Sequence, residues 1–282
     1  MADEFPRTTV GGVSLSRMII GTNWFLGFSH TSSAQDKFIK SYQTRENVAE
    51  ILTVFLNAGV NAIMGVPSQM VTDAINDAQQ RTGRELCLIL TPGFDLTGEG
   101  NAESQPEAQF DNCKQLGARF CFPHTSIIEQ LIDKRAKLIR DIDKYTKMIR
   151  DREMIPGLSC HMPESVVYAD AQGADVETYI QLYNAAGFLM QVEIDWVMNV
   201  IRNAKKPVMT IKPLAAGRLM PVVGLAFAWN TLRDQDLVTI GTTTPDEARE
   251  VIDISLDLLA RRLPDYELQS TRSKANLKAA GS

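Results

Sequence analysis

The segment Leu237-Val-Thr-Ile-Gly-Thr-Thr-Thr-Pro-Asp-Glu247 contains the unit that decides the fold. Its first four residues are a short, mainly apolar run, which is typical of a strand buried on both faces of a sheet. Thr244-Pro-Asp-Glu247 is a capping box, and it predicts a helix over residues 247–262. A buried strand followed directly by a capped helix is the repeating unit of parallel α/β proteins.

This alternation continues through all 282 residues. Eight strands, each followed by a helix, predict one (βα)₈ (TIM) barrel domain over residues 1–282, with residues 264–282 as a frayed tail. A doubly wound sheet is the alternative, but no Gly-x-Gly-x-x-Gly turn follows the first strand. The expected strands are residues 17–25, 62–66, 85–94, 119–123, 155–160, 177–183, 208–212 and 237–241. The expected helices are residues 45–58, 68–80, a segment opened by a capping box at Ser104, an unusually long helix over 126–153 opened by a box at Ser126, then 163–171, 194–204, 222–232 and 247–262.

The composition limits the function classes. Hydrophobic residues make up 44% and charged residues 22%, as in globular proteins with a substantial core. The net charge of −5 argues against general nucleic-acid binding, and no apolar run approaches the roughly 18 residues of a membrane span. The acidic, polar start does not resemble a signal peptide. The four cysteines form no Cys-x-x-Cys pair, so we expect reduced thiols in a cytoplasmic protein. We also expect the partner of this protein to be a small-molecule substrate. The sequence leaves the oligomeric state open.

The histidines and one lysine lie at the ends of expected strands. His124 and His161 end the fourth and fifth strands, His30 follows the first, and Lys212 ends the seventh. Side chains at the carboxyl ends of barrel strands meet at one face and carry the chemistry. We therefore expect His124 and His161 to be catalytic acid–base groups, and Lys212 to bind a carboxylate or phosphate or to form a Schiff base. The structural alternatives are histidines that order loops and a lysine paired with a carboxylate. Other side chains expected at this face are Asn23, Trp24, residues 64–68, Asp95, Tyr183, Asn184 and residues 242–244.

Two loops are suited to an anion. Ala215-Ala-Gly-Arg218 offers a flexible backbone and a guanidinium, and Gly241-Thr-Thr-Thr-Pro245 offers hydroxyls and N–H groups at a helix N-terminus. Ordinary helix capping by Thr244 is the alternative for the second loop. A metal site is not favoured: Asp95 and Glu193 could join the histidines, but no His-x-His or His-x-x-x-His spacing occurs.

Six motifs in register resemble the aldo-keto reductases over nearly the whole chain. They are Gly21-Thr-Asn-Trp24, Ala58-Gly-Val-Asn61, Ile155-Pro-Gly-Leu-Ser159, Gln181-Leu-Tyr-Asn184, Lys212-Pro-Leu-Ala-Ala-Gly-Arg-Leu219 and Ile240-Gly-Thr-Thr-Thr-Pro-Asp-Glu247. The resemblance implies a (βα)₈ barrel that binds NADP(H) at its carboxyl-end loops. Glu247, near the place of the usual arginine, would repel a 2′-phosphate. The cofactor-binding residues that the resemblance implies are Gly21, Thr22, Asn23, Ser159, Gln181, Leu214, Gly217, Arg218, Thr242 and Thr243.

The catalytic tetrad of that family is largely missing. The aldo-keto reductases reduce carbonyls with Asp, Tyr, Lys and His, but the matching positions hold Met64, Gln69 and Pro92, and only His124 has a counterpart. A glutamine cannot replace a phenol as a proton donor of matched pKa. The usual carbonyl-reducing mechanism is therefore not expected. The remaining hypotheses are an atypical NADP-linked oxidoreductase, a lyase or isomerase that uses Lys212 with His124 and His161, and a non-catalytic ligand-binding barrel.

Overall fold

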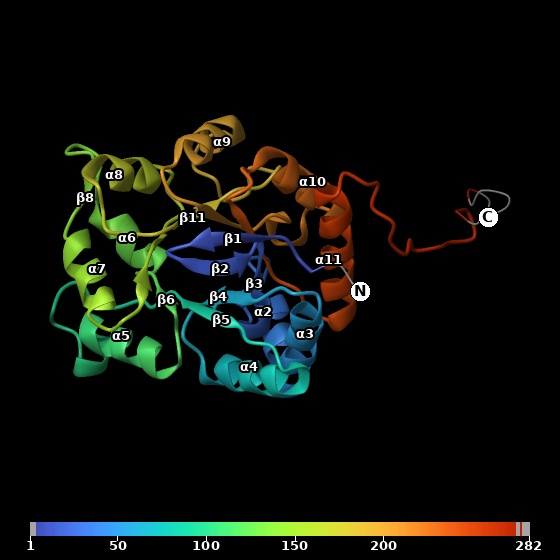
Figure 1. The fold of residues 1–282 in the computed structure, drawn as a ribbon, viewed down its shortest axis with the longest axis horizontal. Coiled ribbons are helices and arrows are strands. Elements are labelled where there is room, and N and C mark those ends of the chain that lie inside the picture. The colour runs from blue at the N-terminus through green and yellow to red at the C-terminus, as the bar shows by residue number, and fades with distance from the viewer. Residues whose placement is uncertain (1–3, 275–276, 278–282) are drawn as a thin grey trace.

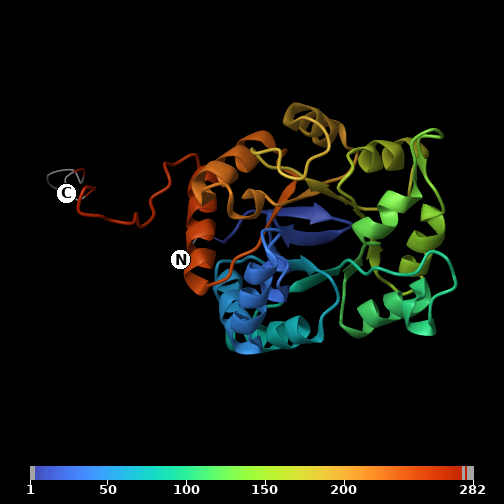
Figure 2. The ribbon, with the colours of Figure 1, turned by 180° about the vertical axis from the view of Figure 1, so that it is seen from behind.

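The computed structural model describes residues 4–274 and residue 277. Parallel strands form a nearly closed barrel with helices around it, which confirms the predicted α/β (TIM) barrel (Figure 1; Figure 2 shows it from behind). The barrel strands are β3 (Met18–Gly21), β4 (Ala62–Gly65), β5 (Cys87–Leu90), β6 (Phe120–Cys121), β9 (Ile155–Pro156), β10 (Leu158–Ser159), β11 (Tyr179–Leu182), β12 (Val208–Ile211) and β13 (Leu237–Ile240). The helices around them are α3 (Arg45–Asn57), α4 (Gln69–Thr82), α5 (Pro106–Gln115), α6 (Thr125–Leu131), α7 (Ile142–Arg150), α8 (Glu164–Gln172), α9 (Ile194–Asn203), α10 (Pro221–Thr231) and α11 (Pro245–Leu259), with short 3₁₀ helices at Ala102–Ser104 and Ala215–Gly217.

Two features close the barrel. β13 pairs in parallel with β3, with Thr239 opposite Ile19, so the last strand lies beside the first. β9 and β10 are the two halves of the fifth predicted strand, separated by Gly157. β9 pairs with β6, and β10 pairs with β11. The peptide chain through Gly157 therefore connects the two ends of the sheet, where the described structure has no strand-to-strand hydrogen bonds.

The strands are apolar on both faces because each face is buried. Within β3, Ile19 points into the barrel while Met18 and Ile20 pack outward against the helices. This alternation gives one core inside the barrel and a larger one between the barrel and the helices. The buried side chains of the inner core are Val10, Leu15, Ile19, Ala62, Met64, Ile89, Phe120, Phe122, Ile155, Ile180, Met209 and Leu237.

Four elements near the N-terminus were not predicted. β1 (Arg7–Val10) and β2 (Val13–Ser16) form an antiparallel hairpin that lies in the centre of the ring of helices (Figure 1). Val10 and Leu15 of this hairpin are fully buried in the inner core. α2 (Ser33–Tyr42) follows the first barrel strand. That strand is also shorter than the predicted 17–25, because Phe25 and Leu26 donate hydrogen bonds back to the Thr22 carbonyl and begin α1 (Asn23–Leu26).

The long helix predicted over residues 126–153 is wrong. The structure instead has α6, a small hairpin of β7 (Ile132–Asp133) and β8 (Leu138–Ile139), and α7. The Asp133 carboxylate accepts hydrogen bonds from two backbone N–H groups in the turn, and Lys137 and Asp141 have left-handed backbones with φ of 55° and 53°. The turn is rich in Lys, Arg and Ala, which are good helix formers, so its composition does not reveal the break.

Of the three predicted capping boxes, only the one at Thr244 has its N-cap bond, and there the Glu247 carboxylate accepts from the N–H of Thr243 and not from that of Thr244. The Thr244 hydroxyl accepts a hydrogen bond from the Glu247 N–H at 3.1 Å and caps α11. At α6 the cap is His124, whose Nδ1 accepts from the Ser126 N–H at 3.2 Å, so the predicted box at Ser126 is wrong. α5 follows Gln105 without any side-chain cap, so the predicted box at Ser104 is wrong as well.

After α11 the chain runs away from the barrel (Figure 1). Leu263 and Leu268 on this segment are 92% and 69% exposed, so they add nothing to either core. The part of the predicted tail over residues 275–276 and 278–282 lies outside the described residues. No helix in the described part of the chain combines the length and the hydropathy needed to cross a membrane.

We expect Gly157→Ala to destabilise the barrel. An added Cβ would lie 2.5 Å from Cε1 of Phe122, which is fully buried in the inner core. Overpacking of this kind costs about 1–3 kcal/mol in the free energy of unfolding, measurable by urea denaturation. Gly93→Ala is the matched control, since its Cβ would have its nearest neighbour 3.9 Å away. Equal stability of the two variants would contradict the view that close packing against Phe122 requires a glycine between β9 and β10.

Candidate active site at the carboxyl face

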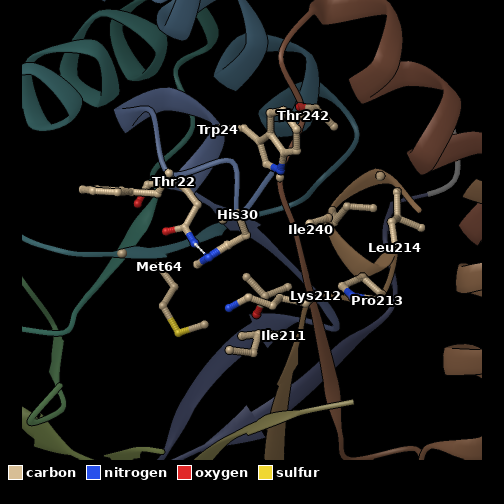
Figure 3. Close-up of a pocket in the computed structure, with 18 of the residues that line it drawn as sticks. Thr22, Trp24, His30, Met64, Ile211, Lys212, Pro213, Leu214, Ile240 and Thr242 are labelled. Atoms are coloured by element: carbon tan, nitrogen blue, oxygen red, sulfur yellow. Dashed lines mark hydrogen bonds between the residues drawn. The ribbon is translucent and has the colours of Figure 1, made fainter. Parts of the chain in front are cut away.

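A cavity of about 790 Å³ opens at the carboxyl ends of the strands. All three histidines and Lys212 line it, although they come from four different strand ends. Figure 3 shows His30, Lys212 and Met64 pointing into the same space. The topology therefore brings together the side chains that the sequence placed at this face. Of the ten residues implied as cofactor-binding, Gly21, Thr22, Asn23, Ser159, Leu214, Gly217, Arg218, Thr242 and Thr243 also line the cavity.

The floor of the cavity is apolar. Met64, Ile180 and Ile211 line it from below and belong to the inner core or pack against it. Met64 is only 5% exposed, and it stands where the resemblance implies an aspartate. A methionine supplies no charge, so the floor offers no counter-charge to a cation in the cavity.

Lys212 is a cation without a counter-charge. It follows β12 in a left-handed conformation with φ of 60°, and its carbonyl accepts a hydrogen bond from the Ala215 N–H at 2.9 Å. Burial lowers the pKa of its ammonium group to about 8. Within residues 4–274, no carboxylate forms an ion pair with this ammonium group. The structural alternative of a lysine paired with a carboxylate is therefore not what the structure shows.

The three imidazoles around Lys212 favour the neutral form. Burial, together with the charge of Lys212, lowers the pKa of His161 to about 4. The same two causes lower the pKa of His30, in the same order. Burial also lowers the pKa of His124, and Lys212 adds to this against the opposing effect of Glu129. At neutral pH the cavity thus presents one ammonium group and three uncharged rings.

Hydrogen bonds fix the orientation of two of the rings. Nε2 of His30 lies 3.2 Å from Nδ2 of Asn23 (Figure 3). His124 accepts the N–H of Ser126 through Nδ1. A neutral imidazole that accepts at one nitrogen carries its proton on the other, so Nε2 of His124 is a donor. His124 can therefore donate a hydrogen bond to an oxygen atom of a ligand.

Glu129 positions His161, a role that the sequence did not reveal. Its Oε1 accepts a hydrogen bond from the Thr125 hydroxyl at 2.9 Å and from the backbone N–H of His161 at 3.3 Å. The same oxygen lies 3.7 Å from Nδ1 of His161, too far for a strong hydrogen bond, and the pKa of that ring stays low. A capping box at Ser126 would have used Glu129, but His124 caps α6, and the Glu129 carboxylate reaches the next strand end.

The loop after β12 is strained and offers a free donor. Ala215, Ala216 and Gly217 have φ of 51°, 55° and 82°, an arrangement that costs energy for the two alanines. Among the described residues, the N–H of Ala216 has no hydrogen-bond acceptor. The Arg218 guanidinium stacks on the Phe188 ring at 4.0 Å and donates to the Ala215 carbonyl. This loop therefore retains the donors on which the predicted anion site depends, and the anion site itself stays a prediction.

The loop after β13 is not open to an anion. Oε2 of Glu247 accepts hydrogen bonds from the backbone N–H of Thr243 at 2.6 Å and from its hydroxyl at 2.7 Å. A carboxylate of the chain thus occupies both donors of Thr243, which the sequence assigned to an incoming anion. The anion site predicted here is blocked by the protein itself.

Several expected residues do not reach the cavity. Gln181 is fully buried, and its Nε2 donates to the His161 carbonyl at 3.0 Å, so it supports the lining from behind. The Asp95 carboxylate accepts hydrogen bonds from its own loop, from Gly100 and Thr97, which lower its pKa to about 2. Burial raises the pKa of the Cys160 thiol to about 11, so this group stays protonated and unreactive near neutral pH.

Other residues outside the lining are Glu193, Tyr183, Asn184, Gln69 and Pro92. Within the described part of the chain, no group of His, Cys, Asp and Glu is arranged to hold a metal ion.

Solved structures that share this architecture are mostly aldo-keto reductases. A candidate aldo-keto reductase from Pseudomonas aeruginosa matches with a TM-score of 0.64 and 13% identity, over 91% of this chain and 97% of the other. An aldo-keto reductase from Klebsiella pneumoniae in complex with NADPH matches with a TM-score of 0.57 and 16% identity, over 98% and 94%. A truncated 3-deoxy-D-arabino-heptulosonate 7-phosphate synthase from Thermotoga maritima reaches a TM-score of 0.50 with 11% identity, over 92% and 90%.

No protein-family model matches the sequence, and no curated protein matches it either. The structural likeness therefore concerns the fold. The chain has an aldo-keto-reductase-like barrel, and its reaction has to be argued from the residues of its own site.

We expect Lys212→Met to raise the pKa of all three imidazoles, because it removes a positive charge that opposes their protonation. The chain has only three histidines, so NMR titration can follow each ring separately. Lys147→Met is the control, since Lys147 pairs with Asp151 on an outer helix. Unchanged histidine titrations in Lys212→Met would show that the lysine does not face these rings.

Proposed function

We propose that this protein is an enzyme that binds a small polar carbonyl compound in the cavity and interconverts it with the alcohol by using a nicotinamide dinucleotide. The uncompensated Lys212 ammonium group above the apolar floor carries the proposal. Negative charge develops on a carbonyl oxygen as it is reduced, and a fixed cation in a water-poor site stabilises that charge strongly. The free cation and the open cavity argue against a barrel that only binds a ligand.

In this proposal Lys212 takes the place of the missing tyrosine. A group with a pKa of about 8 can donate its proton to the oxygen near neutral pH. Nε2 of His124 donates a second hydrogen bond to the same oxygen, and Glu129 holds the His161 backbone so that its ring forms the adjacent wall. Neutral rings beside the lysine leave its charge available to the substrate.

The residues of the cavity fit a dinucleotide at its nicotinamide and diphosphate parts. Ser159 lines the cavity beside the histidines and would hold the nicotinamide amide. The free N–H of Ala216 and the guanidinium of Arg218 would hold the diphosphate. When bound, the nicotinamide ring would supply or accept the hydride. The NADPH complex of the Klebsiella pneumoniae protein of the same fold supports this assignment.

Titration of NADH and NADPH against tryptophan fluorescence tests the proposal, because Trp24 lies in the cavity. We expect at least one dinucleotide to quench the signal at sub-millimolar concentration. Lys212→Met should then lower carbonyl turnover by about 10²–10³-fold, the usual effect of removing a donor to a developing oxyanion. Lys205→Met, which removes an amine bonded to the Asp170 carbonyl outside the cavity, should retain activity. Absence of binding at millimolar cofactor would end the redox proposal.

A Schiff-base lyase or isomerase is the second candidate, and the lowered pKa of Lys212 favours it. A partly neutral amine can attack a carbonyl carbon, with loss of water, to form an imine. Borohydride added with glyoxylate or pyruvate would then reduce the imine and leave a stable adduct on Lys212, detectable by peptide mass spectrometry. Labelling that is no greater at Lys212 than at Lys205 would exclude this candidate.

A further inference from the structure

We infer that the cavity selects a dinucleotide without a 2′-phosphate, NAD(H) over NADP(H), through Glu247 and Glu250. The inference rests on the proposed function and concerns the end of the cavity next to α11. It differs from the cofactor that the sequence resemblance implies.

The position of the second nucleoside follows from the rest of the lining. A ligand with its reacting end at Lys212 and its diphosphate at Ala216 and Arg218 has one part of the cavity left for its other nucleoside. That part is the end formed by the loop after β13 and the first turns of α11. Its lining residues are Thr242, Thr243, Glu247, Glu250 and Val251.

This end carries negative charge only. Glu247 and Glu250 lie one turn apart on α11, and both line the cavity. The two cations of the lining, Lys212 and Arg218, belong to the β12 end, and Arg218 is held there by its contact with Phe188. Lys40, the amine over the ring of Phe28 at the rim, lies outside the lining. A phosphate monoester adds a charge of about −1.5 to −2 at neutral pH, and two carboxylates without a cation repel it.

The same residues can hold ribose hydroxyls. Glu247 uses Oε2 for both of its hydrogen bonds to Thr243, and in the described structure Oε1 accepts none. A carboxylate oxygen is a pure acceptor and is well matched to the hydroxyls of a ribose. Thr242, only 3% exposed, has a hydroxyl with no partner among the described residues, and it lies at this end (Figure 3). A ribose hydroxyl could satisfy both groups, whereas a phosphate could satisfy only the threonine.

Parallel titrations of NADH and NADPH against the full-length protein test the inference by binding alone. We expect NADH to bind about tenfold more tightly than NADPH, a ratio that corresponds to about 1.4 kcal/mol of binding free energy. Glu247→Gln keeps an acceptor for Thr243 and removes the charge. It should therefore improve NADPH binding and lower the ratio of NADH affinity to NADPH affinity. Glu250→Gln should act in the same direction. Asp246→Asn is the matched control. Asp246 is next to Glu247 at the same helix start, but it pairs with Arg249 outside the cavity, so the ratio should not change.

The possible outcomes separate the two proposals. If NADPH binds as tightly as NADH or more tightly, the inference is overturned while the proposed function stands. If NADH is preferred but the preference is unchanged in Glu247→Gln and Glu250→Gln, these carboxylates do not cause it, and the inference is overturned. If neither dinucleotide binds, the proposed function fails and the inference fails with it.

Discussion

The pairing of β13 with β3 brings the last strand of the chain beside the first, and the site depends on this closure. All strands of the closed sheet are parallel, so their carboxyl ends open into one cavity. His30, His124, His161 and Lys212 are far apart in the sequence and become neighbours only in this way. The inner core beneath them, with Met64 at the top, excludes water from the floor. The electrostatics of the site follow from that packing.

A buried cation without a counter-charge is unfavourable unless a ligand supplies one. The chain concentrates this unfavourable state at one atom, Nζ of Lys212. The rings around it favour the neutral form, chiefly because burial lowers their pKa and in part because the charge of Lys212 does so too. At the other end of the cavity lie two carboxylates of α11, Glu247, which accepts hydrogen bonds from Thr243, and Glu250. The cavity therefore has a cationic end and an anionic end, and a ligand has to match both.

The sequence predicted the barrel and most of the named side chains that line the cavity, because apolar runs mark strands and strand ends mark the carboxyl face. It missed what depends on contacts between distant residues. The break at Asp133 lies among good helix formers. Val10 and Leu15 of the β1–β2 hairpin reach the inner core while the residues between them are partly or fully exposed, so the hairpin has no continuous apolar run. His124 was predicted as a site residue but not as the N-cap of α6. Because His124 makes this cap, the Glu129 side chain is not used there and contacts His161 instead. The anion site at Thr243 failed because a sequence motif does not show whether its donors are already used.

The pKa of the Lys212 amine is the most direct test of the central claim, that this cation is half-buried without a partner. It can be measured from the pH dependence of trace acylation at Lys212, read by peptide mass spectrometry. The account predicts an apparent pKa of about 8 in the free protein. A value near 10.5, the ordinary value for lysine, would mean that the ammonium group is hydrated or paired, and would contradict the account.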